Sequence, residues 1–344
     1  MLKKNKRICV VDTVYTLFLY YLICGIDEND IIIMSTGIPE SIRKNINHIY
    51  FPPFKYKEYS DSSKIKKIKQ RLINISQRVY YMLKTRLILL VKVNKKEVEV
   101  YGHAHLIFSF PLYEYDKAYL IEDGLGNYLD LKEPNYTNSI YSKMIRFIGA
   151  DVKNIYECYG THKNIKKVYL TKNKFPEIIK DKVKVVNIKE LWNEKTENEK
   201  SKILKIFNIN RNKIKFNKET VLILTQPLSE EKLTTLDEEL TIYKNIIEKF
   251  KDYDIIIKPH PREEKDYKNI FPNVKIINKS FPIELLSLIG VEPDIAGSIV
   301  STALFNFKKS KIYVYDGELK DERLINGRDE LIKLLKEENI ELIT

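Results

Sequence analysis

Short runs of branched aliphatic residues alternate with helical patterns along most of the chain, and this alternation constrains the fold more than any other feature. The first run, at residues 7–12, is followed by a helical pattern at 13–25. Further strands are expected at 30–34, 48–51, 97–101, 118–122 and 166–170, with a long basic helix at 63–92. Because parallel strands need crossover connections, the alternation predicts an α/β fold with a parallel sheet.

The same pattern starts again after a segment rich in Lys, Glu and Asn at 189–218. Strands are expected at 220–225, 254–257, 274–277, 294–300 and 311–315, and helices up to about 250 and at 283–289, 302–307 and 329–339. A chain of 344 residues can bury two cores. We therefore predict two doubly wound, Rossmann-like domains facing across a cleft, 1–215 and 216–344, with the last helix packing in the second domain or back on the first.

The net charge of +12 indicates an anionic partner. The 59 basic residues are mixed with 47 acidic ones throughout the chain rather than gathered in a stripe, which argues against nucleic acid and leaves lipid headgroups or a nucleotide substrate. Three widely spaced cysteines, Cys9, Cys24 and Cys158, suit buried thiols in a reducing cytoplasm. The apolar stretch at 79–93 is interrupted by Lys84 and Arg86, so no membrane span is expected.

One predicted strand ends in Glu122-Asp123-Gly124. The glycine allows a sharp turn at the carboxyl edge of the sheet, where a carboxylate at Asp123 can accept a proton from a hydroxyl group. An ordinary Asp-Gly turn would have the same sequence.

A second motif, Lys258-Pro259-His260-Pro261, directly follows the apolar run 254–257. The prolines force the chain out of the strand at the sheet edge where α/β proteins bind ligands, so His260 is placed for chemistry. A stiff turn with a hydrogen-bonded imidazole is the structural alternative. Thr225 and Gln226 end the preceding strand and are candidates to approach a nucleotide.

Two further candidate sites lie at the beginnings of predicted helices. Glu284 lies in a first helical turn, where an acid is favourable with the helix dipole and can also accept hydrogen bonds from ribose hydroxyls. The predicted strand at 294–300, which contains Gly297, leads into Ser301-Thr302, whose hydroxyls can bind a phosphate at a helix N-terminus or simply cap the helix.

In order and placement, Glu122-Asp123-Gly124, His260-Pro261 and Ser301-Thr302 resemble the motifs of bacterial sialyltransferases of GT-B type, with glycosyltransferase family 52 the nearest likeness. The resemblance covers mainly residues 115–130 and 220–315. It implies that Asp123 is the general base, that His260 contacts the phosphate and assists the departure of CMP, and that Ser301 and Thr302 hold that phosphate. Glu284 then binds ribose and Lys258 lies near the cytosine.

The family likeness implies an inverting transfer of sialic acid from CMP-sialic acid to a galactoside of a lipooligosaccharide or capsule, by a homodimer acting in the cytoplasm or on the inner face of the plasma membrane. No cofactor is expected. A metal is not expected either, because the histidines are not clustered and His103 and His105 alternate along an expected strand. The alternatives are a CDP-glycerol or CDP-ribitol phosphotransferase and a non-catalytic basic adaptor at membranes or nucleic acid.

Overall fold

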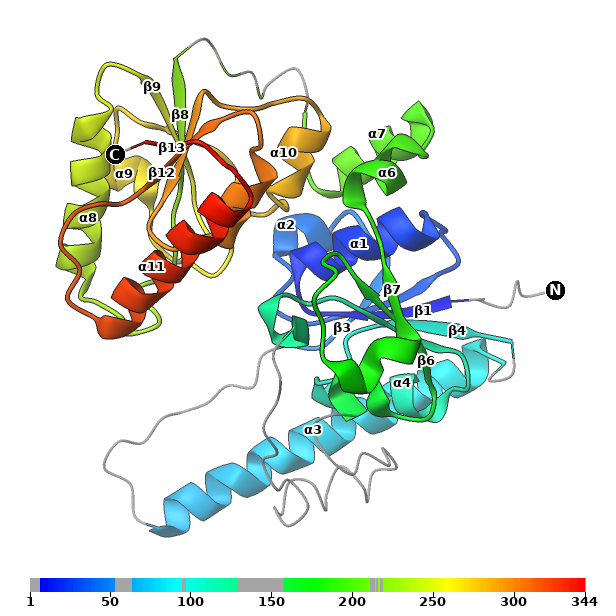
Figure 1. Ribbon diagram of the computed structural model, residues 1–344. Helices are drawn as coiled ribbons and strands as arrows, with labels where there is room; N and C mark the ends of the chain where they lie inside the picture. Colours follow the sequence, from blue (N-terminus) through cyan, green and yellow to red (C-terminus); the bar gives the residue numbers. More distant parts are fainter. Residues whose placement is uncertain are drawn as a thin grey trace. The chain divides into compact units, whose positions relative to one another are not determined.

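The chain folds into two α/β units, Met1–Phe207 and Asn208–Thr344 (Figure 1). The computed structural model describes residues 7–52, 64–94, 97–109, 111–128, 157–210, 214, 216 and 219–343. The sequence placed the domain boundary at 215, a position outside the described residues. Each unit is built on one sheet of parallel strands, as the alternating sequence pattern predicted.

The sheet of the first unit has seven strands in the order β3-β2-β1-β4-β5-β6-β7. Its strands are β1 (Arg7–Val11), β2 (Ile31–Met34), β3 (His48–Tyr50), β4 (Glu99–Gly102), β5 (Ala118–Ile121), β6 (Ile165–Leu170) and β7 (Val183–Val185). Strand order reverses between β1 and β4, where Cys9 pairs with Ile32 on one side and Tyr101 on the other. Such a switch point is where doubly wound sheets bind ligands.

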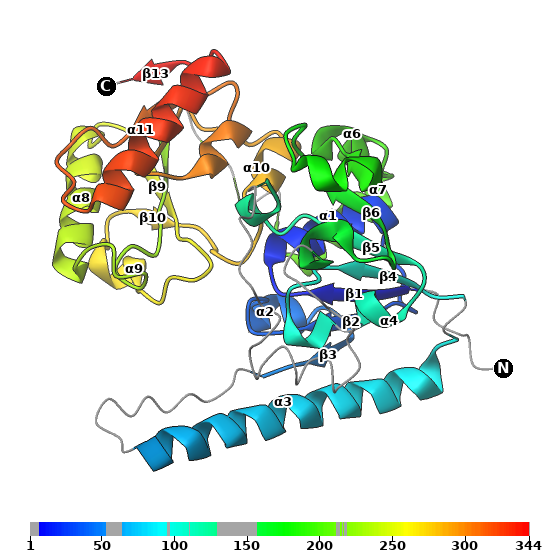
Figure 2. The same ribbon diagram turned by 60° about the horizontal axis from the view of Figure 1, so that its bottom comes forward.

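Helices cover both faces of this sheet (Figure 2). The α-helices are α1 (Val14–Cys24), α2 (Glu40–Arg43), α3 (Lys64–Lys92), α4 (Pro111–Glu114), α6 (Ile188–Asn193) and α7 (Glu197–Ile206). Short turns of other helix types are η1 (Ile107–Ser109), η2 (Leu125–Tyr128), η4 (Glu157–Thr161) and η5 (Glu177–Lys182). Helix α1 starts where the Thr13 side chain accepts from the Thr16 N–H and ends at Gly25, whose φ is 73°.

The second unit repeats the architecture with six parallel strands in the order β10-β9-β8-β11-β12-β13. Its strands are β8 (Thr220–Leu224), β9 (Asp254–Lys258), β10 (Lys275–Ile276), β11 (Ile295–Ser298), β12 (Lys311–Val314) and β13 (Leu342–Ile343). Its helices are α8 (Leu236–Lys249), α9 (Tyr267–Ile270), α10 (Glu284–Leu288), the 3₁₀ turn η6 (Thr302–Asn306) and α11 (Glu322–Glu337). The order reverses between β8 and β11, again giving a switch point.

Several elements differ from the sequence-based expectation. Strand β4 ends at Gly102, so His103 and His105 lie in the loop after it rather than along a strand. The expected helix at 302–307 is the short 3₁₀ turn η6, and α11 begins at Glu322 rather than at 329. Strand β13, which pairs with β12, was not predicted, because two residues are too few for a sequence pattern.

The sequence predicts three buried cysteine thiols and no membrane span. Cys9 is buried and Cys24 half-buried, both as free thiols, while the Cys158 side chain lies outside the described part of the structure. Across the described residues, no helix combines the length and apolar content that a bilayer crossing requires.

Candidate active site

In the first unit, the strand switch point gathers the loops that follow β1, β2, β4 and β5. Two glycines make this close approach possible. A Cβ on Gly102 would lie 1.8 Å from the Val10 carbonyl oxygen, and one on Gly37 would lie 1.7 Å from the Asp12 carbonyl oxygen. Only glycine fits at either position, so the backbone itself brings the residues after β4 beside those after β1.

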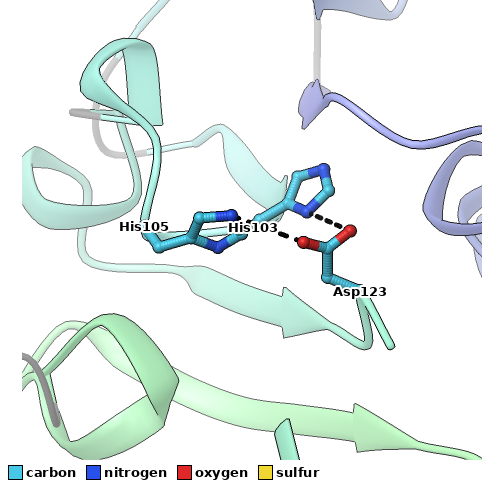
Figure 3. Close-up of side chains that lie close together, drawn as sticks. All are labelled: His103, His105 and Asp123. Atoms are coloured by element: carbon cyan, nitrogen blue, oxygen red, sulfur yellow. Dashed lines mark ion pairs between the residues drawn. The ribbon is translucent and has the colours of Figure 1, made fainter. Parts of the chain in front are cut away.

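Asp123, which follows β5, is surrounded by donors (Figure 3). The Thr13 hydroxyl donates to its Oδ1 at 2.9 Å, and Nδ1 of His103 lies 2.9 Å from the same oxygen. Nε2 of His105 lies 3.4 Å from Oδ2. Thr13 also caps α1, so the carboxylate lies at the positive end of an 11-residue helix.

The position of the proton on His103 is fixed by the backbone. The Asp12 N–H donates to Nε2 of His103 at 2.7 Å, so this nitrogen must carry a lone pair. The neutral ring therefore keeps its proton on Nδ1, the nitrogen that faces Asp123. Since the His103 side chain is 1% exposed, this tautomer is locked inside the protein.

These contacts hold Asp123 in its ionised form. Burial raises the pKa of Asp123, but the donors from His103 and Thr13 and the nearby His105 outweigh it, so the pKa lies below the usual value. Burial lowers the pKa of His105. A carboxylate with one oxygen held by donors and the other facing His105, and with its side chain 23% exposed, can accept a proton from a bound hydroxyl group.

Glu122, the other acid of the motif, has a different task. Its Oε2 accepts from the Thr171 N–H at 2.7 Å, the Thr171 hydroxyl at 2.6 Å and the Tyr128 hydroxyl at 2.6 Å. The residue is 4% exposed. Its hydrogen bonds tie the loop after β5 to the end of β6, so Glu122 has a structural place, whereas the Asp123 side chain is 23% exposed.

His103, His105 and Asp123 also offer three potential metal ligands within 4.8 Å of one another. A metal would need the Nδ1 lone pair of His103, which would move the ring proton to Nε2. That proton would then point at the Asp12 N–H, placing two donors 2.7 Å apart. The hydrogen bond at Nε2 therefore leaves a proton rather than a lone pair on Nδ1, the nitrogen 2.9 Å from Asp123, and a metal bound at Nδ1 would disrupt this arrangement.

In the second unit, the ends of β8 and β9 are joined by hydrogen bonds. The His260 N–H donates to Oε2 of Glu263 at 2.6 Å and to the Thr225 hydroxyl oxygen at 3.2 Å, and the Thr225 hydroxyl itself donates to Glu263. The Tyr267 hydroxyl donates to the other Glu263 oxygen at 2.7 Å. Glu263, which is fully buried, therefore fixes the turn that carries His260.

His260 is neutral, with its proton on Nε2. The Arg262 N–H donates to Nδ1 of His260 at 3.2 Å, which leaves the proton on the opposite nitrogen. Burial, together with the positive charges of Arg262 and Lys258, lowers the pKa of His260 to about 4. At neutral pH this side chain is a neutral hydrogen-bond donor, and an anion bound beside it would raise its pKa.

Lys258 ends β9 as a buried amine. Its Nζ lies 4.8 Å from the centre of the Phe281 ring, and burial lowers the pKa of Lys258 to about 8 despite the nearby Glu284 and Glu263. Glu284 begins α10, and its Oε1 accepts from the Asn306 amide at 3.4 Å. Asn306 belongs to η6, so α10 and η6 are linked at this edge.

The remaining candidates lie at the ends of β8 and β11. Oε1 of Gln226 accepts from the Val300 N–H at 3.0 Å, joining the two strands. Ser301 caps η6 by accepting from the Ala303 N–H at 3.3 Å, and Thr302 is exposed. Gly297 is buried inside β11, where a Cβ would lie 3.4 Å from the Tyr313 ring, so packing explains this residue.

The structure thus brings most of the predicted residues of the second unit to one sheet edge. These residues lie at the ends of β8, β9 and β11 or on the turns linked to them: Thr225, Gln226, Lys258, Pro259, His260, Glu284, Ser301 and Thr302. Gly297 does not reach this edge. Asp123 belongs to the first unit.

Sequence reasoning missed His103, Thr13 and Glu263 as partners of the predicted residues. The spacing of three between His260 and Glu263 was a usable signal, since it suits a turn closed by a side chain. No sequence signal joins Thr13 to Asp123, because the pair is 110 positions apart.

The sequence of the chain matches a known protein family. The family model of glycosyltransferase family 52 matches residues 38–321. An uncharacterized protein of Haemophilus influenzae is 37% identical over 235 residues, which cover 68% of this chain and 73% of that protein.

Solved structures of bacterial sialyltransferases share the fold. An α-2,3-sialyltransferase of Photobacterium phosphoreum is 17% identical with a TM-score of 0.53, and the match covers 99% of each chain. A 2,6-sialyltransferase of Photobacterium sp. JT-ISH-224, solved with CMP and lactose, is 14% identical with a TM-score of 0.55, covering 98% of this chain and 78% of that one. The motif resemblance is confirmed: the chain belongs to glycosyltransferase family 52 and has the GT-B fold of bacterial sialyltransferases.

Proposed function

We propose that this glycosyltransferase moves sialic acid from CMP-sialic acid to a galactoside hydroxyl of a surface glycan, with inversion at the anomeric carbon. The observation that carries the proposal is the state of Asp123, a carboxylate held ionised by Thr13 and by the Nδ1–H of His103. Family membership and the fold shared with sialyltransferases support the choice of reaction.

In the proposed reaction, Asp123 accepts the proton of the acceptor hydroxyl. The acceptor oxygen forms a bond to the anomeric carbon while the bond from that carbon to the phosphate oxygen of CMP breaks, and the electron pair leaves with CMP. Because the sugar ring passes through an oxocarbenium-like state, most of the developing negative charge appears on the phosphate.

The second unit supplies the groups that would hold this phosphate and its nucleoside. His260 donates from Nε2, and the hydroxyls of Ser301 and Thr302 add further donors. Glu284 accepts from the ribose hydroxyls, and Lys258 lies on the cytosine side. As negative charge develops on the phosphate, the Nε2–H of His260 donates a stronger hydrogen bond to it, which stabilises the departing CMP.

We propose that the reaction needs no metal or other cofactor. The tautomer of His103 supports this, since the Asp12 N–H occupies the lone pair of Nε2, and Nδ1, which then carries the ring proton, lies 2.9 Å from Asp123. Addition of EDTA should leave the rate unchanged.

The decisive test is incubation with CMP-sialic acid and lactose, read by mass spectrometry. A sialylated lactose and free CMP are expected from the wild-type protein and not from Asp123→Ala. If the protein instead consumed CDP-glycerol and ignored CMP-sialic acid, it would be a phosphotransferase. Failure to bind either nucleotide in calorimetry would favour a non-catalytic role.

A further inference from the structure

Asp12 lies beside the proposed base, Asp123, and the proposed reaction leaves its carboxylate without a task. The residue directly follows β1, one of the two strands at the switch point of the first sheet. Its backbone N–H donates to Nε2 of His103 at 2.7 Å, and the other nitrogen of that ring lies 2.9 Å from Asp123. A single imidazole therefore joins the two aspartates at the carboxyl edge of the sheet.

One oxygen of the Asp12 carboxylate has a partner in the protein, and the other does not. The Gly37 N–H, in the loop after β2, donates to Oδ1 of Asp12 at 3.0 Å. Across the described residues, Oδ2 accepts no hydrogen bond. Since Asp12 is half-buried and Oδ2 is not a buried atom, this oxygen is accessible to a ligand.

The two aspartates lie close enough for their charges to interact. Burial raises the pKa of Asp12, the Gly37 N–H and His103 lower it, and the charge of Asp123 raises it again. Because neighbouring carboxylates repel each other, hydrogen-bond donors from a ligand would relieve the repulsion.

The neighbouring strand adds a buried hydroxyl at the same edge. Val11 of β1 pairs with Met34 of β2, so Asp12 and Ser35, the next residues of the two strands, leave the sheet side by side. Ser35 is 8% exposed, and its hydroxyl oxygen is buried with no hydrogen-bond partner in the described part of the chain. Buried polar groups in proteins are nearly always paired, so an unpaired hydroxyl at this edge points to a polar ligand.

Sugar hydroxyls suit this edge better than ionic groups do. A phosphate or carboxylate would be repelled by Asp12 and Asp123. A divalent cation fits less well, because the three potential metal ligands within 4.8 Å of one another in the described residues are His103, His105 and Asp123, without Asp12. Hydroxyls donate to carboxylates, and neighbouring hydroxyls of one sugar ring can reach two carboxylates that are close but not in contact.

We infer that Oδ2 of Asp12 binds a second hydroxyl of the acceptor sugar, next to the hydroxyl that reacts at Asp123. The inference rests on the proposed function. Asp12 takes part in no bond that forms or breaks, so it determines specificity: it selects a terminal galactose whose hydroxyl beside the reacting one is free. A reaction that glycosylates or acylates this neighbouring hydroxyl must therefore follow the transfer of sialic acid and cannot precede it.

The first part of the test is Asp12→Asn. Asparagine keeps an oxygen that can accept from the Gly37 N–H, and the contact with His103 uses the backbone, so the variant should fold. Its kcat/KM for lactose should fall about tenfold to a hundredfold, mainly through a higher KM, because a hydrogen bond to a charged group is lost. The affinity for CMP in calorimetry should stay within about twofold, and the exposed Asp116→Asn should match the wild-type protein.

Lactose analogues that lack single hydroxyls on galactose distinguish a contact with the acceptor from a structural role. In the wild-type protein, one analogue lacking a hydroxyl next to the reacting position should have a kcat/KM about tenfold or more below that of lactose. In Asp12→Asn, the kcat/KM values for this analogue and for lactose should agree within about threefold, because the group that recognised the hydroxyl is gone. Circular dichroism checks the fold, and Asp12→Ser repeats the comparison if Asp12→Asn does not fold.

The inference and the proposed function fail in different ways. If the wild-type protein sialylates lactose, but every analogue loses the same factor in the wild-type protein and in the Asp12 variant, the function stands and the inference is wrong. If the wild-type protein transfers no sialic acid, both are wrong. A rate that depends on added Mg²⁺ or Mn²⁺ in the wild-type protein and not in Asp12→Asn would make Asp12 a cation ligand and would also overturn the inference.

Discussion

The carboxyl edges of the two sheets each hold a histidine, and the two rings carry their protons on opposite nitrogens. In the first unit, the Asp12 N–H occupies Nε2 of His103, so the proton lies on Nδ1 beside Asp123. In the second unit, the Arg262 N–H occupies Nδ1 of His260, so the proton lies on Nε2.

The difference shows how one residue type serves two tasks. His103 is 1% exposed and directs its proton to a carboxylate of the protein, so it is a positioning residue. His260 is half-buried, and its proton remains for an anionic ligand. In each ring, a single backbone N–H donates to one nitrogen and so determines that the other nitrogen carries the proton.

The largest expected effect comes from removing the carboxylate of Asp123, which His103 positions. Asp123→Ala should lower the transfer rate about a thousandfold, since a general base contributes on the order of 10² to 10⁴. The affinity for CMP, measured by calorimetry, should stay within about twofold. The exposed Asp116→Asn serves as control, and a variant at Asp123 that kept the parent rate would rule out this base.

Replacing the ligand-side histidine should give the opposite pattern. His260→Asn should weaken CMP binding about tenfold to a hundredfold, as expected for the loss of a hydrogen bond to a charged group. Calorimetry with CMP measures the effect, and His48→Asn is the matched control in the other unit. Unchanged affinity together with an unchanged rate would remove His260 from the nucleotide site.

A smaller effect is expected from His103→Gln. The rate should fall about tenfold because Asp123 loses a donor, while CMP affinity stays unchanged. Loss of that donor also raises the pKa of Asp123, so the acidic limb of the pH profile of kcat/KM should move to higher pH. If the limb did not move, His103 would have only a structural role.

The smallest expected effect is on the pH dependence of the free energy of unfolding. Because the pKa of His260 is about 4 in the folded protein and about 6.5 in an unfolded chain, the unfolded state binds more protons between these values. Stability is therefore lost as the pH falls from about 6.5 to 4. Urea unfolding at about pH 6.5 and about pH 4 should show that His260→Gln loses less free energy of unfolding between these pH values than the wild-type protein does. An NMR titration that placed the pKa of the His260 ring near 6.5 would contradict the assignment.

Much of the fold could be predicted from the sequence. The strands at 30–34, 118–122 and 166–170 appear within one residue of their expected bounds as β2, β5 and β6. Buried parallel strands are nearly continuous apolar runs, so they are easily recognised. The errors lie where the pattern is short or polar, as at β13, η6 and the start of α11.

The candidate site was predicted only in part. Asp123 and His260 each stand at the end of an apolar run, and the sequence shows that directly. His103 was assigned to a strand because its alternation with His105 imitates the period of two. Its true place depends on Gly102, whose φ of 126° and close approach to Val10 turn the chain toward Asp123.

The sequence by itself determined two parallel sheets, the motifs at their edges and the family, because strand patterning and motif order are local properties of the chain. Only the tertiary structure decided which acid of Glu122-Asp123 is available, which nitrogen of each histidine carries the proton, and that His103 joins Asp12 to Asp123. These properties depend on partners far apart in sequence, such as Thr13 and Asp123, and proton positions follow from which donor the fold brings within hydrogen-bonding distance.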